Sequence, residues 1–195
     1  DYLTEMSDIL QFHGGTLDKY IGDAIVGMFG APLPYEDHAH RACLTAIEMQ
    51  QRQVEMRERW KQDGTWPEIV PLMQTRIGLN TGQAVIGNMG SPRRFNYTMM
   101  GDNVNLAARC ESGAKAYGVY TMITEATWQS SVAASDDIAF RFLDQIVVKG
   151  RSQPVRMFEV IGKKDEISDE TAACLACFAD GMERYLACDW DRARA

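Results

Sequence analysis

Stretches typical of strands alternate with stretches typical of helices along most of this 195-residue chain, and that order limits the folds open to it. Residues 16–21 and 24–29 have the composition of strands and flank Gly22-Asp23, a two-residue turn of the kind that closes a tight hairpin. Residues 36–62 then carry an amphipathic helical pattern after the Pro32/Pro34 break. We therefore expect a hairpin followed by a long helix that packs on a sheet.

The rest of the chain continues this interleaving. Thr81-Gly82 predicts a second hairpin between residues 73–80 and 83–87, and Asp102 is expected to cap a helix. The remaining expected elements are helices over 2–13, 102–116 and 125–132 and strands over 95–100, 120–123, 138–148 and 155–161.

The formal net charge of −7 opposes loose binding to phosphate backbones, so a general nucleic-acid binder is disfavoured. No run of about 18 apolar residues and no secretory leader is found, so we predict no membrane segment in this piece and a cytoplasmic location. Five cysteines, an odd count, are interpreted as reduced thiols in a core.

Both ends of the sequence indicate a longer protein. Tyr2, Met6 and Leu10 already form a helical apolar stripe, so we expect an upstream segment to be missing from view. Beyond residue 161 the composition changes, and a helix with Phe178 and Tyr185 resembles the opening helix of a tetratricopeptide-type repeat. Residues 162–195 are therefore interpreted as a linker and the start of a C-terminal helical region.

Two residues of the first hairpin are candidates for chemistry. Asp23 at the tip is either a turn former or an oxygen ligand for a hard cation. Strand alternation places Lys19 on the face of Leu17 and Ile21, where the pattern asks for an apolar side chain. An unpaired buried ammonium is costly, so we expect Lys19 to meet a polar group, such as the edge of a ligand.

Three more polar residues have two interpretations each. Asn105 and Arg109 are four residues apart and project from one helix face, which is either a solvated face or part of a site. Lys149 lies between two expected strands and is either an exposed turn residue or a phosphate contact. Spacing alone leaves these alternatives open.

Four segments resemble, in order and approximate separation, the motifs of class III nucleotidyl cyclase catalytic domains. They are residues 19–24 (KYIGDA), 96–101 (NYTMMG), 104–109 (VNLAAR) and the Lys149-Gly150 loop. The resemblance covers residues 1–161. It implies an α+β fold with a ferredoxin-like βαββαβ core and added elements, and a head-to-tail homodimer in which each active site draws residues from both subunits.

The resemblance also implies roles for single residues. Asp23 matches a metal-binding aspartate for two Mg²⁺ or Mn²⁺ ions, and Lys19 and Thr98 match the positions that read the purine. Lysine with threonine goes with adenine, whereas glutamate with cysteine goes with guanine, so ATP is the expected substrate. Asn105 and Arg109 match the catalytic residues that orient the ribose and meet charge on the α-phosphate. Lys149 matches the residue that holds the β- and γ-phosphates.

The implied activity is adenylate cyclase, which forms 3′,5′-cyclic AMP and pyrophosphate by two-metal-assisted attack of the ribose 3′-hydroxyl on the α-phosphate. Threonine at position 98 is similar to the soluble, bicarbonate-responsive branch, so stimulation by bicarbonate is a hypothesis. The family's first metal aspartate lies in a strand upstream of residue 1, and these 195 residues are expected to lack turnover by themselves. The alternative function is an inactive cyclase-homology module for nucleotide binding or regulatory dimerisation.

Overall fold

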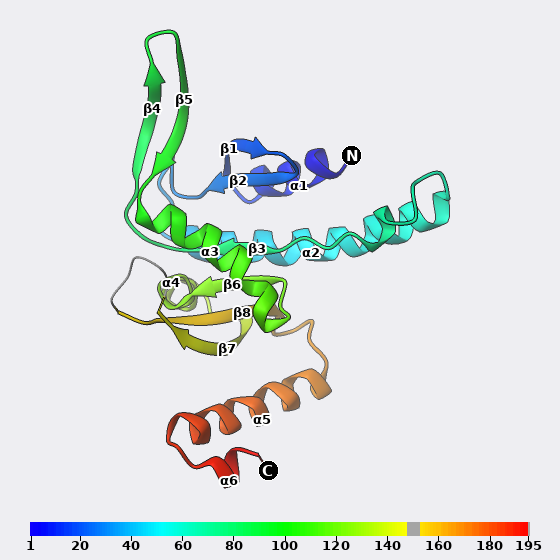
Figure 1. Ribbon diagram of the computed structural model, residues 1–195, viewed down its shortest axis with the longest axis vertical. Coiled ribbons are helices and arrows are strands. Elements are labelled where there is room, and N and C mark those ends of the chain that lie inside the picture. The colour runs from blue at the N-terminus through cyan, green and yellow to red at the C-terminus, as the bar shows by residue number, and fades with distance from the viewer. Residues whose placement is uncertain (148–152, 195) are drawn as a thin grey trace.

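The computed structural model describes residues 1–147 and 153–194 (Figure 1). Its N-terminal layer consists of helix α1 (Tyr2–Phe12) and the antiparallel hairpin of β1 (Thr16–Ile21) and β2 (Ala24–Met28). Gly27 allows the close packing of this layer, because a Cβ there would lie 2.8 Å from Cδ2 of Leu10 on α1. The predicted first helix and first hairpin are thus present.

The second layer is a four-stranded sheet in the order β3-β6-β8-β7. Strand β3 (Ile77–Leu79) runs parallel to β6 (Thr121–Thr124), and both β6 and β7 (Ile138–Ile146) run antiparallel to β8 (Val155–Lys163). Among the described residues, β3 pairs only with β6 and β2 pairs only with β1. The β1–β2 hairpin and the four-stranded sheet are therefore separate, and the edges formed by β2 and β3 are not joined.

Helices cover both faces of the four-stranded sheet. Met122 of β6 packs against the helix α3 (Asp102–Tyr117), while its neighbour Ile123 packs against α2 (His38–Asp63), as alternation along a strand requires. Helix α4 (Glu125–Ala134) adds Trp128, which stacks on Phe158 of β8 at 4.7 Å between ring centroids. The elements α1-β1-β2-α2-β3 follow the expected βαββαβ order from its first helix onward, and the mixed α+β fold is confirmed.

The predicted hairpin between residues 73–80 and 83–87 is wrong. Strand β4 (Val85–Ser91) pairs instead with β5 (Arg94–Met100), and this hairpin arm projects from the body of the molecule (Figure 1). Residues 73–76 are not a strand, because the side chain of Gln53 on α2 bonds both the backbone N–H of Thr75 (2.9 Å) and its hydroxyl (2.7 Å). These contacts join residues distant in sequence, so local turn chemistry did not reveal them.

Two smaller expectations also need correction. Asp102 is the first residue of α3 and Gly101 takes the capping position, so the carboxylate of Asp102 favours the helix through its N-terminal dipole instead. Cys43 and Cys110 are the buried thiols, and burial raises the pKa of each to about 12. The other three cysteines, at positions 174, 177 and 188, are exposed.

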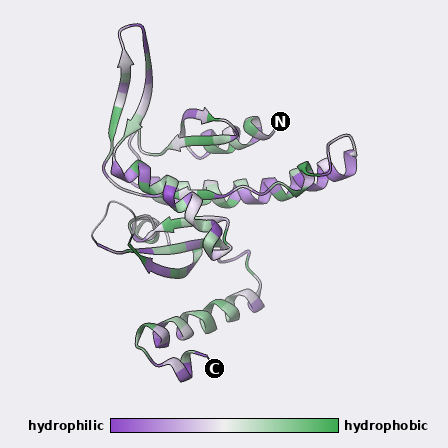
Figure 2. Cartoon of the chain, viewed as in Figure 1, coloured by the Kyte–Doolittle hydropathy of each residue, from purple (hydrophilic) through white to green (hydrophobic). Residues whose placement is uncertain are grey.

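The C-terminal helices α5 (Asp169–Leu186) and α6 (Trp190–Ala193) lie beyond β7, and α5 carries many apolar residues (Figures 1 and 2). Ser168 caps α5 by accepting a hydrogen bond from the backbone N–H of Thr171 at 3.1 Å. The guanidinium of Arg141 on β7 stacks over the Phe178 ring at 5.2 Å. The short 3-10 helix η1 (Val70–Leu72) completes the described elements. None of the helices among these residues combines the length and apolar character needed to cross a bilayer.

Candidate functional site

Three polar side chains from β1 and β5 meet at the junction of the first hairpin and the projecting arm. The ammonium Nζ of Lys19 donates to the hydroxyl of Thr98 at 3.0 Å, and that hydroxyl donates to Oδ2 of Asp18 at 2.6 Å. Nζ of Lys19 also lies 3.6 Å from Oδ1 of Asp18. The Asp18 side chain is 1% exposed and the Lys19 side chain 41%, so the cluster has a buried carboxylate and an accessible ammonium.

Lys19 therefore meets polar groups, as predicted, and in this structure they belong to the protein itself: the Thr98 hydroxyl and the Asp18 carboxylate. The simple alternation used for Lys19 does not hold along β1, because the register with β2 shifts between Leu17 and Lys19 and leaves Asp18 without a cross-strand partner. Asp18 and Lys19, although adjacent, consequently both reach Thr98. Asp18 was missed from the sequence, since neither the shift nor the approach of β1 to β5 has a local signal.

Asp23 is exposed at the tip of the β1–β2 turn, next to Gly22 with φ of +64°. A Cβ at Gly22 would have no atom within 4 Å, so the turn is open to a ligand. The carboxylate suits a hard divalent cation, which proteins often hold through one or two carboxylates together with substrate phosphates. No group of three or more potential ligands occurs among residues 1–147 and 153–194, so Asp23 fits such an ion as one contributor to a set that needs others.

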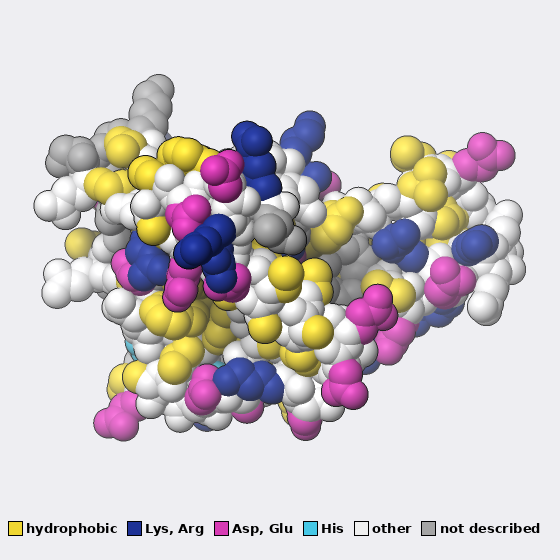
Figure 3. Space-filling model, turned by 90° about the horizontal axis from the view of Figure 1, so that it is seen from below, with side chains coloured by type: hydrophobic (Ala, Val, Ile, Leu, Met, Phe, Trp, Pro, Cys, Tyr) yellow, Lys and Arg dark blue, Asp and Glu magenta, His cyan; other side chains and the backbone are white. Residues whose placement is uncertain are grey.

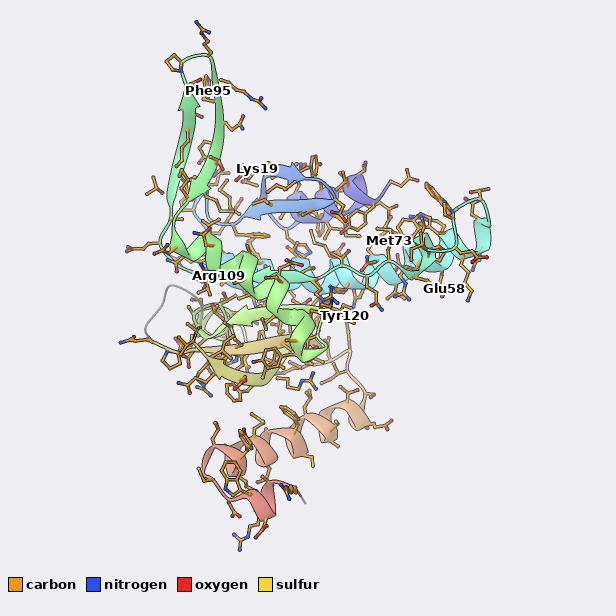
Figure 4. All side chains as sticks on the ribbon, in the orientation of Figure 1. Lys19, Glu58, Met73, Phe95, Arg109 and Tyr120 are labelled. Atoms are coloured by element: carbon orange, nitrogen blue, oxygen red, sulfur yellow. The ribbon has the colours of Figure 1, made fainter. Side chains whose placement is uncertain are left out.

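Helix α3 presents the other candidates. Asn105 is exposed and Arg109 half-buried, whereas Leu106 and Cys110 face the core. Figure 4 shows Lys19 on the β1–β2 hairpin and Arg109 on α3, two separate elements. The predicted shared face of Asn105 and Arg109 is consistent with these burial classes.

An amide network fixes where α3 begins. The side-chain amide of Asn80, at the end of β3, donates to the backbone carbonyl of Asn103 at 3.0 Å and accepts from the Thr124 hydroxyl at 2.7 Å. Asn103 in turn donates to the carbonyl of Gln83 at 2.9 Å. These contacts tie the start of α3 to β3 and β6 and so position Asn105 and Arg109. Sequence reasoning missed them because they join residues 20 to 44 positions apart.

Lys149 lies outside the described residues. The structure therefore brings Lys19 and Thr98 together. It places Asp23 at the tip of the β1–β2 turn and Asn105 and Arg109 on helix α3.

The projecting arm and the adjoining hairpin expose large apolar side chains. Val85, Phe95 and Met100 of the arm are 69%, 63% and 59% exposed, and Ile21 of β1 is 62% exposed. Elsewhere, on the face drawn in Figure 3, basic and acidic side chains are mixed and form no continuous basic stripe. Large apolar side chains left exposed on a projecting hairpin are typical of a protein–protein contact.

Comparisons with known proteins agree with the fold and with the predicted family. The family model of the adenylate and guanylate cyclase catalytic domain matches residues 1–162, and the chain belongs to that family. It is 33% identical over 162 residues to adenylate cyclase 1 of Rhizobium meliloti, covering 83% of this chain and 23% of that protein. The chain spans 31% or less of the length of the first three curated relatives it matches.

Two solved structures are also similar. The adenylyl cyclase CyaB from P. aeruginosa matches with a TM-score of 0.72 and 32% identity over 86% of this chain and 82% of that one. The guanylyl cyclase Cya2 matches with a TM-score of 0.68 and 31% identity, covering 86% and 80%. Because both nucleotide specificities occur among such similar structures, overall similarity does not select the substrate.

Proposed function

We propose that this domain is an adenylate cyclase that converts ATP to 3′,5′-cyclic AMP and pyrophosphate at a site shared by two copies of the chain. The observation that carries the substrate choice is the direct contact of Lys19 with Thr98. An ammonium and a hydroxyl held together on two strands match the lysine–threonine pair that the family resemblance associates with adenine. The alternative pair, glutamate with cysteine, is absent at these positions.

The remaining roles follow from residue chemistry and from the same resemblance. The exposed carboxylate of Asp23 would hold divalent ions, two per site with an upstream aspartate, and such ions lower the pKa of the ribose 3′-hydroxyl and neutralise pyrophosphate. Asn105 orients the ribose, and Arg109 stabilises the charge that develops on the α-phosphate as the 3′-oxygen bonds to phosphorus and the bond to pyrophosphate breaks. Lys149 holds the β- and γ-phosphates.

The exposed apolar arm supports the dimeric part of the proposal. Ile21 lies on the strand that carries Lys19, Val85 and Met100 pair directly at the base of the arm, and Phe95 lies near the tip of the arm (Figure 4). Burying such side chains against a second copy stabilises a dimer by about 25 cal/mol for each Å² of apolar surface, before the costs of association. We propose that this contact joins the surface around Asp23 of one subunit to the surface of α3 that carries Asn105 and Arg109 in its partner. The dimer is proposed to act in the cytoplasm.

The nucleotide preference is tested by exchanging the purine-reading pair. In the full-length protein, Lys19→Glu combined with Thr98→Cys is expected to lower kcat/KM for ATP and raise it for GTP, changing their ratio by more than about tenfold, because the donor and acceptor pattern is reversed. Cyclic AMP and cyclic GMP formation with Mn²⁺ measures this ratio. Lys61→Glu, an exposed change at the far end of α2, is the control and should leave the ratio unchanged. A wild-type preference for GTP would contradict the proposal.

Bicarbonate regulation is a further part of the proposal, and the reason for it is the threonine at position 98. Added bicarbonate at constant pH is expected to raise turnover, whereas chloride at equal ionic strength is not. Equal turnover with both salts would remove bicarbonate from the account while leaving the cyclase assignment intact.

The rival function is a cyclase homologue that binds nucleotide without converting it. The two are separated by measuring nucleotide binding and cyclic AMP formation on the same full-length protein. Binding of ATP without turnover, together with no carboxylate upstream to complete the Asp23 site, would favour the rival.

A further inference from the structure

We propose that Asp18 is a positioning residue that fixes the direction of the Thr98 hydroxyl and thereby makes the site select an amino group over a carbonyl on the purine. The inference rests on the proposed function, because it concerns how that same site distinguishes ATP from GTP. Neither the sequence motifs nor the family resemblance assigned a role to Asp18.

The geometry assigns the hydroxyl proton of Thr98 to Asp18. The oxygens lie 2.6 Å apart, which is the length typical of a charge-assisted O–H···O⁻ hydrogen bond. A carboxylate accepts and does not donate, so the one hydrogen of the Thr98 hydroxyl is used in this bond. The ammonium of Lys19 lies 3.6 Å from the other carboxylate oxygen and pairs with its negative charge.

Once that hydrogen is used, Thr98 can only accept. A threonine hydroxyl has two acceptor lone pairs, and the ammonium of Lys19 occupies one of them at 3.0 Å. The remaining lone pair suits an incoming N–H donor and repels another acceptor. Adenine presents an amino group at its C6 position, whereas guanine presents a carbonyl oxygen there. Lys19 retains N–H donors for the neighbouring ring nitrogen, which accepts in adenine and carries a hydrogen in guanine.

The opposite strand leaves room for a base beside Thr98. The β4–β5 register pairs Thr98 with Gly87, and directly paired residues of antiparallel strands project from the same face. A Cβ placed on Gly87 would have no atom within 4 Å, so the space next to the Thr98 side chain is open on that strand. We therefore place the planar purine edge on this side of Thr98, which is itself 8% exposed.

The burial of Asp18 supports a specific role. Its side chain is 1% exposed, and Oδ1 has no hydrogen-bond partner among the described residues. A buried carboxylate with an unsatisfied oxygen destabilises a fold, and an apolar residue in its place is often neutral or stabilising. Asp18 accepts a hydrogen bond from Thr98 and forms an ion pair with Lys19, so its effect is expected at these two side chains and first on the direction of the Thr98 hydroxyl.

The test is the ratio of kcat/KM for ATP to kcat/KM for GTP in the full-length protein. Asp18→Ala is expected to lower this ratio about tenfold or more, because the freed Thr98 hydroxyl can turn and donate to the guanine carbonyl. Asp18→Asn is expected to lower it about threefold, since a neutral amide presents either its oxygen or its nitrogen to Thr98. In a Thr98→Ala background, replacing Asp18 should change the ratio no further, because Asp18 acts through Thr98.

Glu159→Gln is the matched control, because Glu159 is another largely buried carboxylate, paired with Arg141 in the other sheet. It should reduce stability without changing the ratio. If Asp18→Ala does not fold, Asp18→Asn alone decides. A wild-type protein that prefers ATP, with unchanged ratios in the folded Asp18 variants, would overturn this inference and leave the proposed function standing. A wild-type protein that makes no cyclic AMP, or prefers GTP, would overturn both.

Discussion

Replacing Arg109 with alanine is expected to lower kcat for cyclic AMP formation by a hundredfold to a thousandfold. The guanidinium is assigned to charge that appears on the α-phosphate only in the transition state, and removing one preorganised donor of this kind costs about 3 kcal/mol. Since the same interaction is weaker in the bound substrate, KM should change much less than kcat. Steady-state kinetics of the full-length protein with Mn²⁺ and ATP measure both constants.

The control for this variant is on the same helix. Lys115, in the last turn of α3, is exposed, and Lys115→Ala should leave kcat within about twofold of wild type. Circular dichroism and denaturant unfolding establish that the Arg109→Ala protein is folded before its kcat is compared with wild type. A folded Arg109→Ala protein with wild-type kcat would remove Arg109 from the catalytic site.

Replacing Gly78 with alanine is expected to cost about 3 kcal/mol or more of stability. A Cβ at this position would overlap the backbone carbonyl of Ala107 and the backbone N–H of Glu111, so β3 and α3 would have to separate. Backbone atoms cannot turn aside as a flexible side chain can. Denaturant unfolding of wild type and variant measures the loss, and the displaced α3 should also reduce activity.

Gly87→Ala is the matched glycine control, because its added methyl group would have no atom within 4 Å. Its free energy of unfolding should stay within about 1 kcal/mol of wild type. If Gly78→Ala is as stable as Gly87→Ala, the close approach of β3 to α3 in this account is wrong.

Local sequence patterns were sufficient to predict most helices and strands, because turn residues and hydrophobic periodicity act over only a few neighbouring residues. The Gly22-Asp23 turn and the amphipathic pattern of α2 each predicted an element within a few residues of its observed bounds. The hairpin at Thr81-Gly82 failed, because β3 is held by a parallel partner 44 residues away and by the close contact of Gly78 with α3. Turn chemistry carries no information about such partners.

In the candidate site, too, some residues could be predicted from the sequence and others could not. Strand alternation singled out Lys19 and the family resemblance singled out Thr98, and the fold brings the two into direct contact although they are 79 residues apart. Asp18 required knowledge of the register shift in β1, and Asn80 required knowledge of how α3 docks on the sheet. Both are contacts between distant segments, and both were invisible to alternation and helical period.

The shared site is the central claim, and mixing two inactive variants of the full-length protein tests it most directly. Asp23→Ala and Asn105→Ala should each be inactive. In a head-to-tail dimer, their heterodimer combines the intact Asp23 of one subunit with the intact Asn105 of the other, so an equimolar mixture should recover about a quarter of wild-type activity. A mixture that stays inactive, although native mass spectrometry shows that heterodimers have formed, would contradict the account.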